Sequence, residues 1–105
     1  MRIGIVGGVD RNAGALQDIA HARGHQLELH TGVLASAASA ATLRALVGRS
    51  ELVVIVTDIN SHNGVRTARR EAQRRQRSLK LVRRMGATQF AALLAGLGQV
   101  GAGAA

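Results

Sequence analysis

The sequence predicts a small α/β fold built around a four-stranded parallel sheet, and three observations favour this class. Short apolar segments alternate with helical segments four times along 105 residues, as in βαβ units. Two of these apolar segments are almost continuously apolar, as expected of strands that are covered on both faces. Phe90 is the only aromatic residue, so the core must consist of closely packed layers of Val, Leu, Ile and Ala.

Four strands are predicted, at 2–6, 25–30, 52–57 and 79–82. The first and third are apolar almost throughout, whereas the second and fourth alternate between apolar and polar residues, as edge strands do. This difference favours the strand order 2-1-3-4, the start of a flavodoxin-like sheet within the broad flavodoxin/Rossmann-like class, over the order 3-2-1-4, which would place the third strand at an edge.

Four helices are predicted, at about 12–23, 39–47, 62–77 and 88–97. Gly24 and Gly48 follow the first two helices, in the position where glycine commonly ends a helix. Right-handed crossovers place the first helix on one face of the sheet and the next two on the other, and the fourth returns beside the first. We therefore expect a three-layer sandwich over residues 1–97, followed by a flexible Gly/Ala-rich tail over 98–105.

Composition narrows the classes of function. The net charge of +8 suits an anionic partner such as a phosphate, a carboxylate or a nucleic acid, although it also serves solubility alone. The absence of cysteine excludes disulfides and thiolate metal sites, and no apolar run reaches the roughly 20 residues of a membrane span. We expect a cytoplasmic domain with no membrane partner, and its small sheet favours pairing in a homodimer.

The loops that follow the predicted strands supply the candidate site. Parallel strands end at one edge of a sheet, and α/β proteins bind ligands at that edge. With the order 2-1-3-4, His30 and His62 face each other across the first strand, about 10 Å apart between backbones. His62, at the start of the third helix, is a candidate ligand for haem iron or a metal, or a donor to an anion there. Alternatively, Ser61 or His62 merely caps the helix, and His30 is merely a solvated residue at a strand end.

The same edge holds four further candidates. Asp58 is a candidate ribose-binding or catalytic carboxylate, or a group that orients His62. Gly7 and Gly8 either cradle a phosphate with backbone N–H groups or permit a sharp turn, and their spacing matches neither the Walker nor the dinucleotide motif. Arg11 is positioned to meet an anion. Because no nucleophile or second convergent acid completes a catalytic set, an enzyme is the less favoured interpretation.

The third predicted helix is rich in arginine. Its apolar stripe is narrow, and four arginines at helical spacing form one face: Arg66, Arg70, Arg74 and Arg77. Such a face can follow the phosphates of DNA or RNA. A solvated helix surface is the other interpretation of the same run, and the chain lacks the aromatic residues on which single strands stack.

Several short motifs, in order, resemble a bacterial family catalogued as domain of unknown function 2325. The resemblance covers about residues 3–94 and rests on Ile5-Val6-Gly7-Gly8, the Gly24 turn, His30-Thr31-Gly32, the run from Val56 to His62, and the ending from Gly86 to Leu94. It implies a small α/β fold and directs attention to His30, Asp58, Ser61 and His62, but it implies no particular reaction.

The leading hypothesis is a non-enzymatic ligand-binding or sensor domain that holds haem, or a divalent transition metal, through His62. His30, or His62 of a second subunit, is the expected second ligand, and Arg11 and Arg66 would pair with the haem propionates. The alternative is a nucleic-acid or nucleotide-phosphate binder that uses the arginine-rich helix and the Gly7-Gly8 loop.

Overall fold

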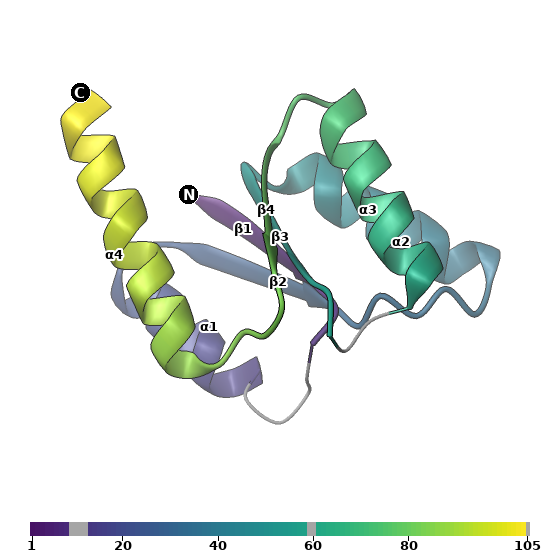
Figure 1. The fold of residues 1–105 in the computed structure, drawn as a ribbon, viewed down its shortest axis with the longest axis horizontal. Coiled ribbons are helices and arrows are strands. Elements are labelled where there is room, and N and C mark those ends of the chain that lie inside the picture. Colours follow the sequence, from purple (N-terminus) through teal and green to yellow (C-terminus); the bar gives the residue numbers. More distant parts are fainter. Residues whose placement is uncertain (9–12, 59–60, 105) are drawn as a thin grey trace.

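The predicted strand order is confirmed. The computed structural model describes residues 1–8, 13–58 and 61–104 and contains a parallel sheet in the order β2-β1-β3-β4 (Figure 1). The four strands are β1 (Arg2–Val6), β2 (Gln26–His30), β3 (Leu52–Val56) and β4 (Ser78–Val82). Both central strands, β1 and β3, are largely buried, whereas the edge strands β2 and β4 are half-exposed, as their apolar patterns predict.

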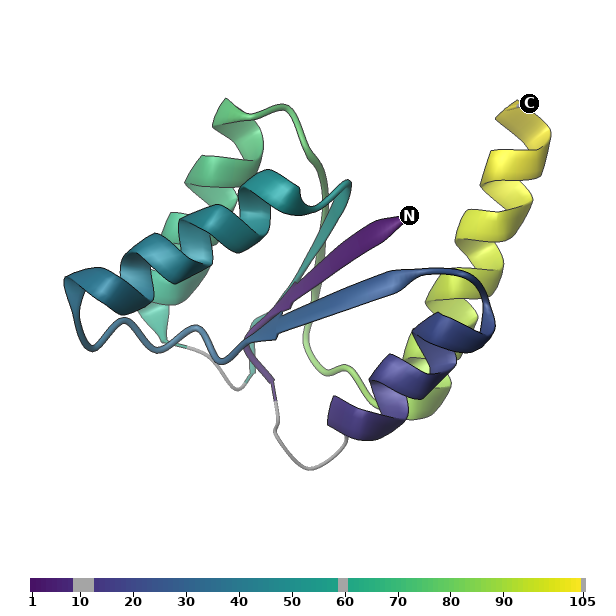
Figure 2. The same cartoon turned by 180° about the vertical axis from the view of Figure 1, so that it is seen from behind.

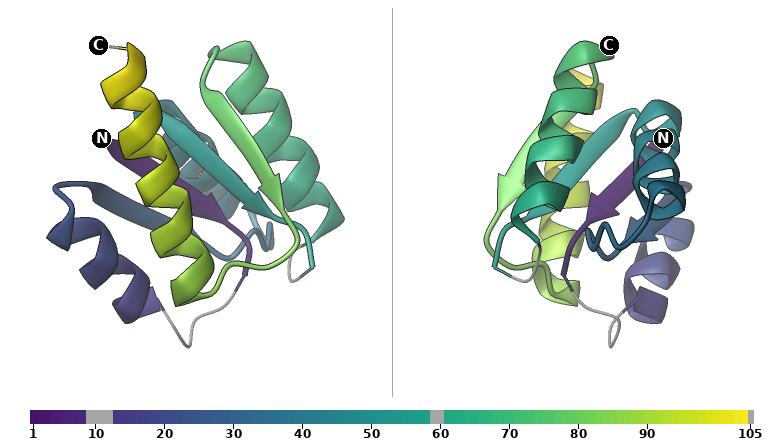
Figure 3. Two further views of the ribbon diagram at one scale, coloured as in Figure 1. Left: turned by 60° about the vertical axis from the view of Figure 1, so that its left-hand side comes forward. Right: turned by 90° about the vertical axis from the view of Figure 1, so that its right-hand side faces the viewer.

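Helices cover both faces of the sheet. On one face lie α1 (Ala13–Ala22) and α4 (Ala87–Ala104), which pack against each other, and on the other lie α2 (Ala37–Arg49) and α3 (His62–Arg74), as Figures 1 and 2 show. This arrangement is the predicted three-layer sandwich. All four strands run in one direction, so their carboxyl ends and the loops that follow them share one edge (Figure 3).

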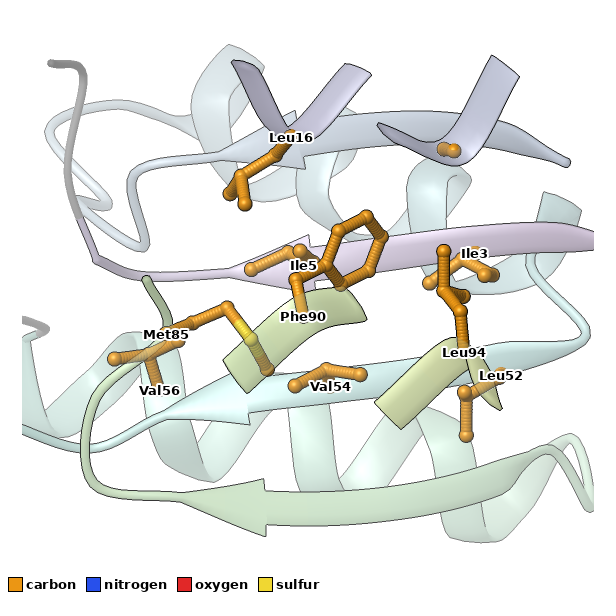
Figure 4. Packing of buried hydrophobic residues seen from close by; sticks show 10 residues of the cluster. Ile3, Ile5, Leu16, Leu52, Val54, Val56, Met85, Phe90 and Leu94 are labelled. Atoms are coloured by element: carbon orange, nitrogen blue, oxygen red, sulfur yellow. The ribbon is translucent and has the colours of Figure 1, made fainter. Parts of the chain in front are cut away.

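The sheet separates two apolar cores. Phe90, fully buried, lies at the centre of the core beneath α1 and α4, in contact with the layer formed by Ile3, Ile5, Val54 and Leu94 (Figure 4). The core beneath α2 and α3 contains no aromatic side chain among its buried members: Val6, Leu43, Leu46, Val47, Val53, Ile55, Ala68 and Ala72. Small apolar residues therefore let the helices approach the sheet closely.

The predicted ends of α2 were wrong at both termini. The helix begins at Ala37 because Ser36 caps it: the Ser36 Oγ accepts a hydrogen bond from the Ser39 N–H, and the Ser39 hydroxyl accepts one from the Ser36 N–H. At the other end Gly48 continues the helix instead of ending it. A Cβ at Gly48 would lie 2.9 Å from the Arg75 guanidinium, so glycine serves close packing of α3 against α2 here.

The third helix ends earlier than predicted, at Arg74. Arg75 caps it, Gln76 adopts a positive φ of 55°, and the Arg77 N–H returns to the Ala72 carbonyl. Arg77 therefore lies outside the helix, where its side chain donates a 2.7 Å hydrogen bond to the Gly48 carbonyl. By contrast, α4 continues past its predicted end to Ala104, so residues 98–104 are helical, and the flexibility expected of this segment stays a prediction.

Candidate functional site

The carboxyl edge of the sheet brings together the loops that the sequence singled out. Gly7 and Gly8 follow β1, His30 ends β2, Asp58 follows β3, and Ser61 and His62 begin α3. A backbone hydrogen bond of 2.7 Å from the Gly7 N–H to the His30 carbonyl joins the first two loops. Gly7 and Gly8 both have positive φ, 87° and 84°, which explains why glycine is needed at this turn.

His30 is held by backbone groups through both ring nitrogens. Its Nδ1 accepts a 2.8 Å hydrogen bond from the Gly32 N–H, so the ring proton lies on Nε2, which is 3.2 Å from the Ser39 carbonyl oxygen and donates to it. This is a neutral imidazole with neither nitrogen available. A role for His30 as a ligand to iron or another metal would require one of these two hydrogen bonds to break.

Ser61 caps α3, as one of the predicted alternatives has it. Its Oγ accepts a 2.8 Å hydrogen bond from the Gly64 N–H and donates one of 2.6 Å to the Gly32 carbonyl. One hydroxyl group therefore accepts from a backbone N–H that has no partner within the first turn of α3, and it also joins α3 to the loop after β2. Gly32 is buried and has a φ of 84°, a conformation that favours glycine.

His62 differs from His30 in its availability. It is the first residue of α3 and is exposed, and within residues 1–8, 13–58 and 61–104 its ring makes no hydrogen bond or ion pair. The two histidines belong to loops that the Ser61–Gly32 hydrogen bond joins, and of the two only His62 has ring nitrogens without a partner among the residues that the structure describes. Arg66 follows His62 by one helical turn and is also exposed.

Asp58 faces the end of β4. Its carboxylate lies 3.5 Å from Arg83 Nε and 3.2 Å from Arg84 Nε, and its N–H donates to the Arg83 carbonyl. These contacts occupy the carboxylate that was considered as a group to orient His62. Sequence reasoning did not single out Arg83 or Arg84. Their position directly after the fourth strand was the available signal, because every loop at that edge borders the same site.

A pocket of about 250 Å³ lies beside Asp58. Gly8 and Val56 form one side, and residues 83–86 with Gln89 of α4 form the other. Arg11, which was expected to meet an anion near Gly8, lies outside the described residues, as do the rest of the 9–12 loop and residues 59–60. The pocket is therefore defined by the ends of β1 and β3 and by the turn from β4 into α4.

The arginines of α3 divide into two groups. Arg74 and Arg75 pair with the buried Glu71 at 2.9 Å and 3.1 Å, and the hydrogen bond from Arg74 is the main reason why the pKa of Glu71 is lowered. Arg66, Arg69 and Arg70 are exposed and make no ion pair in the described part of the chain. The predicted four-arginine face was thus wrong for Arg77, which lies beyond the helix, and Arg74 is engaged by Glu71.

Two further properties concern the described residues as a whole. They contain no group of three or more His, Asp or Glu side chains placed to hold a metal ion. None of the helices traced in these ranges combines the length and apolarity needed to cross a membrane.

Comparison with known proteins identifies the family. Searches among curated proteins and among solved structures found no match to this chain. A family model described as "Uncharacterized protein conserved in bacteria (DUF2325)" matches residues 2–97, which is nearly the whole chain and includes every strand. The chain therefore belongs to this bacterial family, the domain of unknown function 2325.

Proposed function

We propose that this protein is a non-enzymatic ligand-binding or sensor domain that holds haem through His62 at the carboxyl edge of the sheet. The observation that carries the proposal is the exposed His62 ring at the start of α3, with no protein partner in the described ranges. The hydroxyl of the neighbouring Ser61 holds the start of this helix in place, because it accepts a hydrogen bond from Gly64 and donates one to Gly32. An available imidazole on a fixed helix start is a suitable axial ligand.

Haem suits this edge better than a bare metal ion does. A divalent transition metal usually takes three or four protein ligands, whereas haem iron needs one or two. Because backbone groups engage both nitrogens of His30, His62 is the one of the two that is ready to coordinate. Bound haem would supply an iron that can exchange an electron or take up a small gas molecule.

Neighbouring side chains would complete the contact with haem. Arg66, one turn along α3, is placed to pair with a propionate carboxylate. Val33, next to Gly32 in the joined loop, is 56% exposed and offers apolar surface. A second His62, from another copy of the chain, would supply the sixth ligand in a homodimer. For a divalent metal, the same pair would supply two of the three or four protein ligands that it usually takes. We place this domain in the cytoplasm, which suits a chain without cysteine.

Titration with haem tests this proposal. We expect the wild-type protein to give a shifted Soret band that His62→Ala abolishes, while His21→Ala leaves it unchanged. His21 is an exposed histidine on α1, so it controls for loose binding to any surface imidazole. Parallel titrations with Zn²⁺ and Ni²⁺ examine the metal alternative. Equal haem spectra for the wild type and His62→Ala would contradict the proposal.

Nucleic-acid or nucleotide-phosphate binding is the second candidate function. It is favoured by Arg66, Arg69 and Arg70 of α3, which are exposed and make no ion pair within the described residues. Positive side chains along a helix can follow a phosphate backbone, and the Gly7-Gly8 turn at the same edge could hold a terminal phosphate. We expect binding of a duplex DNA probe to weaken with salt. Each of Arg66→Gln and Arg70→Gln should lower the salt slope by about 1, and Arg23→Gln should not. Binding that is indifferent to salt would contradict this candidate.

A further inference from the structure

The pocket beside Asp58 lies where the direction of strand connection reverses. From β1 the chain moves to α1 on one face of the sheet, and from β3 it moves to α3 on the other face (Figures 1 and 3). Gly8 and Val56 stand at the ends of these two strands and line the pocket. Such reversal points leave a crevice between diverging loops, which is where open α/β sheets bind ligands.

The floor of this pocket is apolar. Val56 and Met85 are both buried, belong to the core that contains Phe90 (Figure 4) and line the pocket. Gly8 lies next to Val56: a Cβ at Gly8 would lie 3.5 Å from Val56 Cγ2, so a larger side chain there would take up space in the pocket. The volume of about 250 Å³ exceeds the roughly 150 Å³ of a cavity that holds benzene, and is below the range for drug-sized ligands.

The rim of the pocket is positively charged. The side chains of Arg83 and Arg84 are 87% and 83% exposed, and within residues 1–8, 13–58 and 61–104 Asp58 is the one carboxylate that pairs with both. Among the described residues, two guanidinium groups against one carboxylate leave one surplus positive charge, and together they carry more N–H donors than one carboxylate can accept. Arg84 also borders an adjoining hollow of about 360 Å³ between β4 and α4, where Lys80 adds a further cation.

From this combination we infer a binding site for a small organic anion at the junction of β1, β3 and α4. The ligand has a carboxylate or phosphate group, held by Arg84 and Arg83, and an apolar part about the size of one ring, which covers Val56 and Met85. Asp58 competes with the ligand for the two arginines and so limits the affinity. The site does not involve His62 and is independent of the proposed haem ligation.

The test uses the full chain and backbone amide NMR with phenyl phosphate as the probe. We expect saturable shifts at the amides of Gly8, Val56 and Gly86. Arg84→Gln should weaken binding about fivefold to tenfold, because one charged donor is lost. Asp58→Asn should strengthen binding about threefold, because the competing charge is removed. His62→Ala should bind like the wild type, which separates this site from the proposed function.

Two controls decide between this site and general attraction to a basic surface. Arg44→Gln removes the charge of an exposed arginine on α2, which has no ion pair in the described residues, and should leave the affinity unchanged. The affinity for benzoate shows whether the site also binds a carboxylate. The affinity for inorganic phosphate, compared with that for phenyl phosphate, shows how much the ring contributes to binding. Equal losses in Arg44→Gln and Arg84→Gln, equal affinity for inorganic phosphate and phenyl phosphate, or no gain in Asp58→Asn would each overturn the inference.

Discussion

Ser61 joins the start of α3 to the loop after β2 through a hydrogen bond to Gly32. The Ser61 Oγ donates to the Gly32 carbonyl over 2.6 Å while it accepts from the Gly64 N–H over 2.8 Å. The N–H of the same Gly32 donates to His30, so one short segment links the two histidine-bearing loops. Hydrogen bonds thus join loops at the carboxyl edge of the sheet that are far apart in the sequence, since Ser61 and Gly32 are separated by 29 positions.

Ser61→Ala should lower the free energy of unfolding by about 1–3 kcal/mol. The loss combines the cap of α3, about 1 kcal/mol, with a carbonyl at the buried Gly32 that loses its partner. Chemical denaturation measures the change. Ser36→Ala, which removes the exposed cap of α2, is the matched control and should lose only the cap energy. An equal loss in both variants would mean that the contact with Gly32 adds nothing to stability.

Glu71→Gln should destabilise the protein at neutral pH by about 1 kcal/mol, and the difference should shrink in acid. Hydrogen bonds from Arg74 and then Arg75 hold the pKa of Glu71 below its ordinary value of 4.5. A carboxyl with a lowered pKa in the folded state contributes its full stability above that ordinary value, and the contribution disappears as the pH falls through the lowered pKa. Unfolding curves measured from pH 7 to pH 2 check this prediction, and a difference independent of pH would refute it.

Gly4→Ala should destabilise the protein by about 1–3 kcal/mol through overpacking. Gly4 lies in β1 beneath α2, where a Cβ would overlap the side chains of Leu46 and Ser50. Gly96→Ala is the contrasting control, because among the described residues no atom outside its own stretch of helix backbone lies within 4 Å of a Cβ at this position. That change should stabilise α4 by about 0.5–1 kcal/mol, and thermal unfolding should show shifts of opposite sign. Shifts of the same sign would show that close packing over β1 is not the reason for Gly4.

Phe90→Ala should cost about 3–5 kcal/mol and leave the protein marginally folded or unfolded. Phe90 is the largest fully buried side chain and fills the space between α4 and the sheet. Phe90→Leu keeps most of the apolar volume and should remain folded, with a smaller loss. Circular dichroism and denaturation of both variants measure the difference. A stable Phe90→Ala protein would mean that the layer relaxes to fill the space.

Much of the fold could be predicted from apolar patterns because burial acts on each strand directly. Continuous apolar residues in β1 and β3 placed them at the centre of the sheet, and alternation in β2 placed it at an edge. The ends of the helices were harder to predict. Gly48 resembles a helix stop in sequence, but it continues α2, and its lack of a Cβ leaves room for the guanidinium of Arg75, the residue that caps α3.

The partners of Asp58 show a second limit of sequence reasoning. Val56 and Val82 pair in the parallel register of β3 and β4, so Asp58 and Arg84 follow at equal distances from that pair and meet. Pairing of strands 26 residues apart decides this contact, and local periodicity carries no information on it. The sequence placed Asp58 at the correct edge but could not tell which neighbour would take its charge.

The sequence by itself determined the layers, the order of the strands and the edge where polar side chains gather, because hydrophobic periodicity reports which face of each element is buried. The tertiary structure alone decided which polar groups remain available. His30 and His62 are the same residue type at the same edge, yet Gly32 and Ser39 occupy both nitrogens of the first, while the second has no partner in the described ranges. Hydrogen bonding depends on atoms brought together by the folding of loops, and that arrangement is absent from any pattern along the chain.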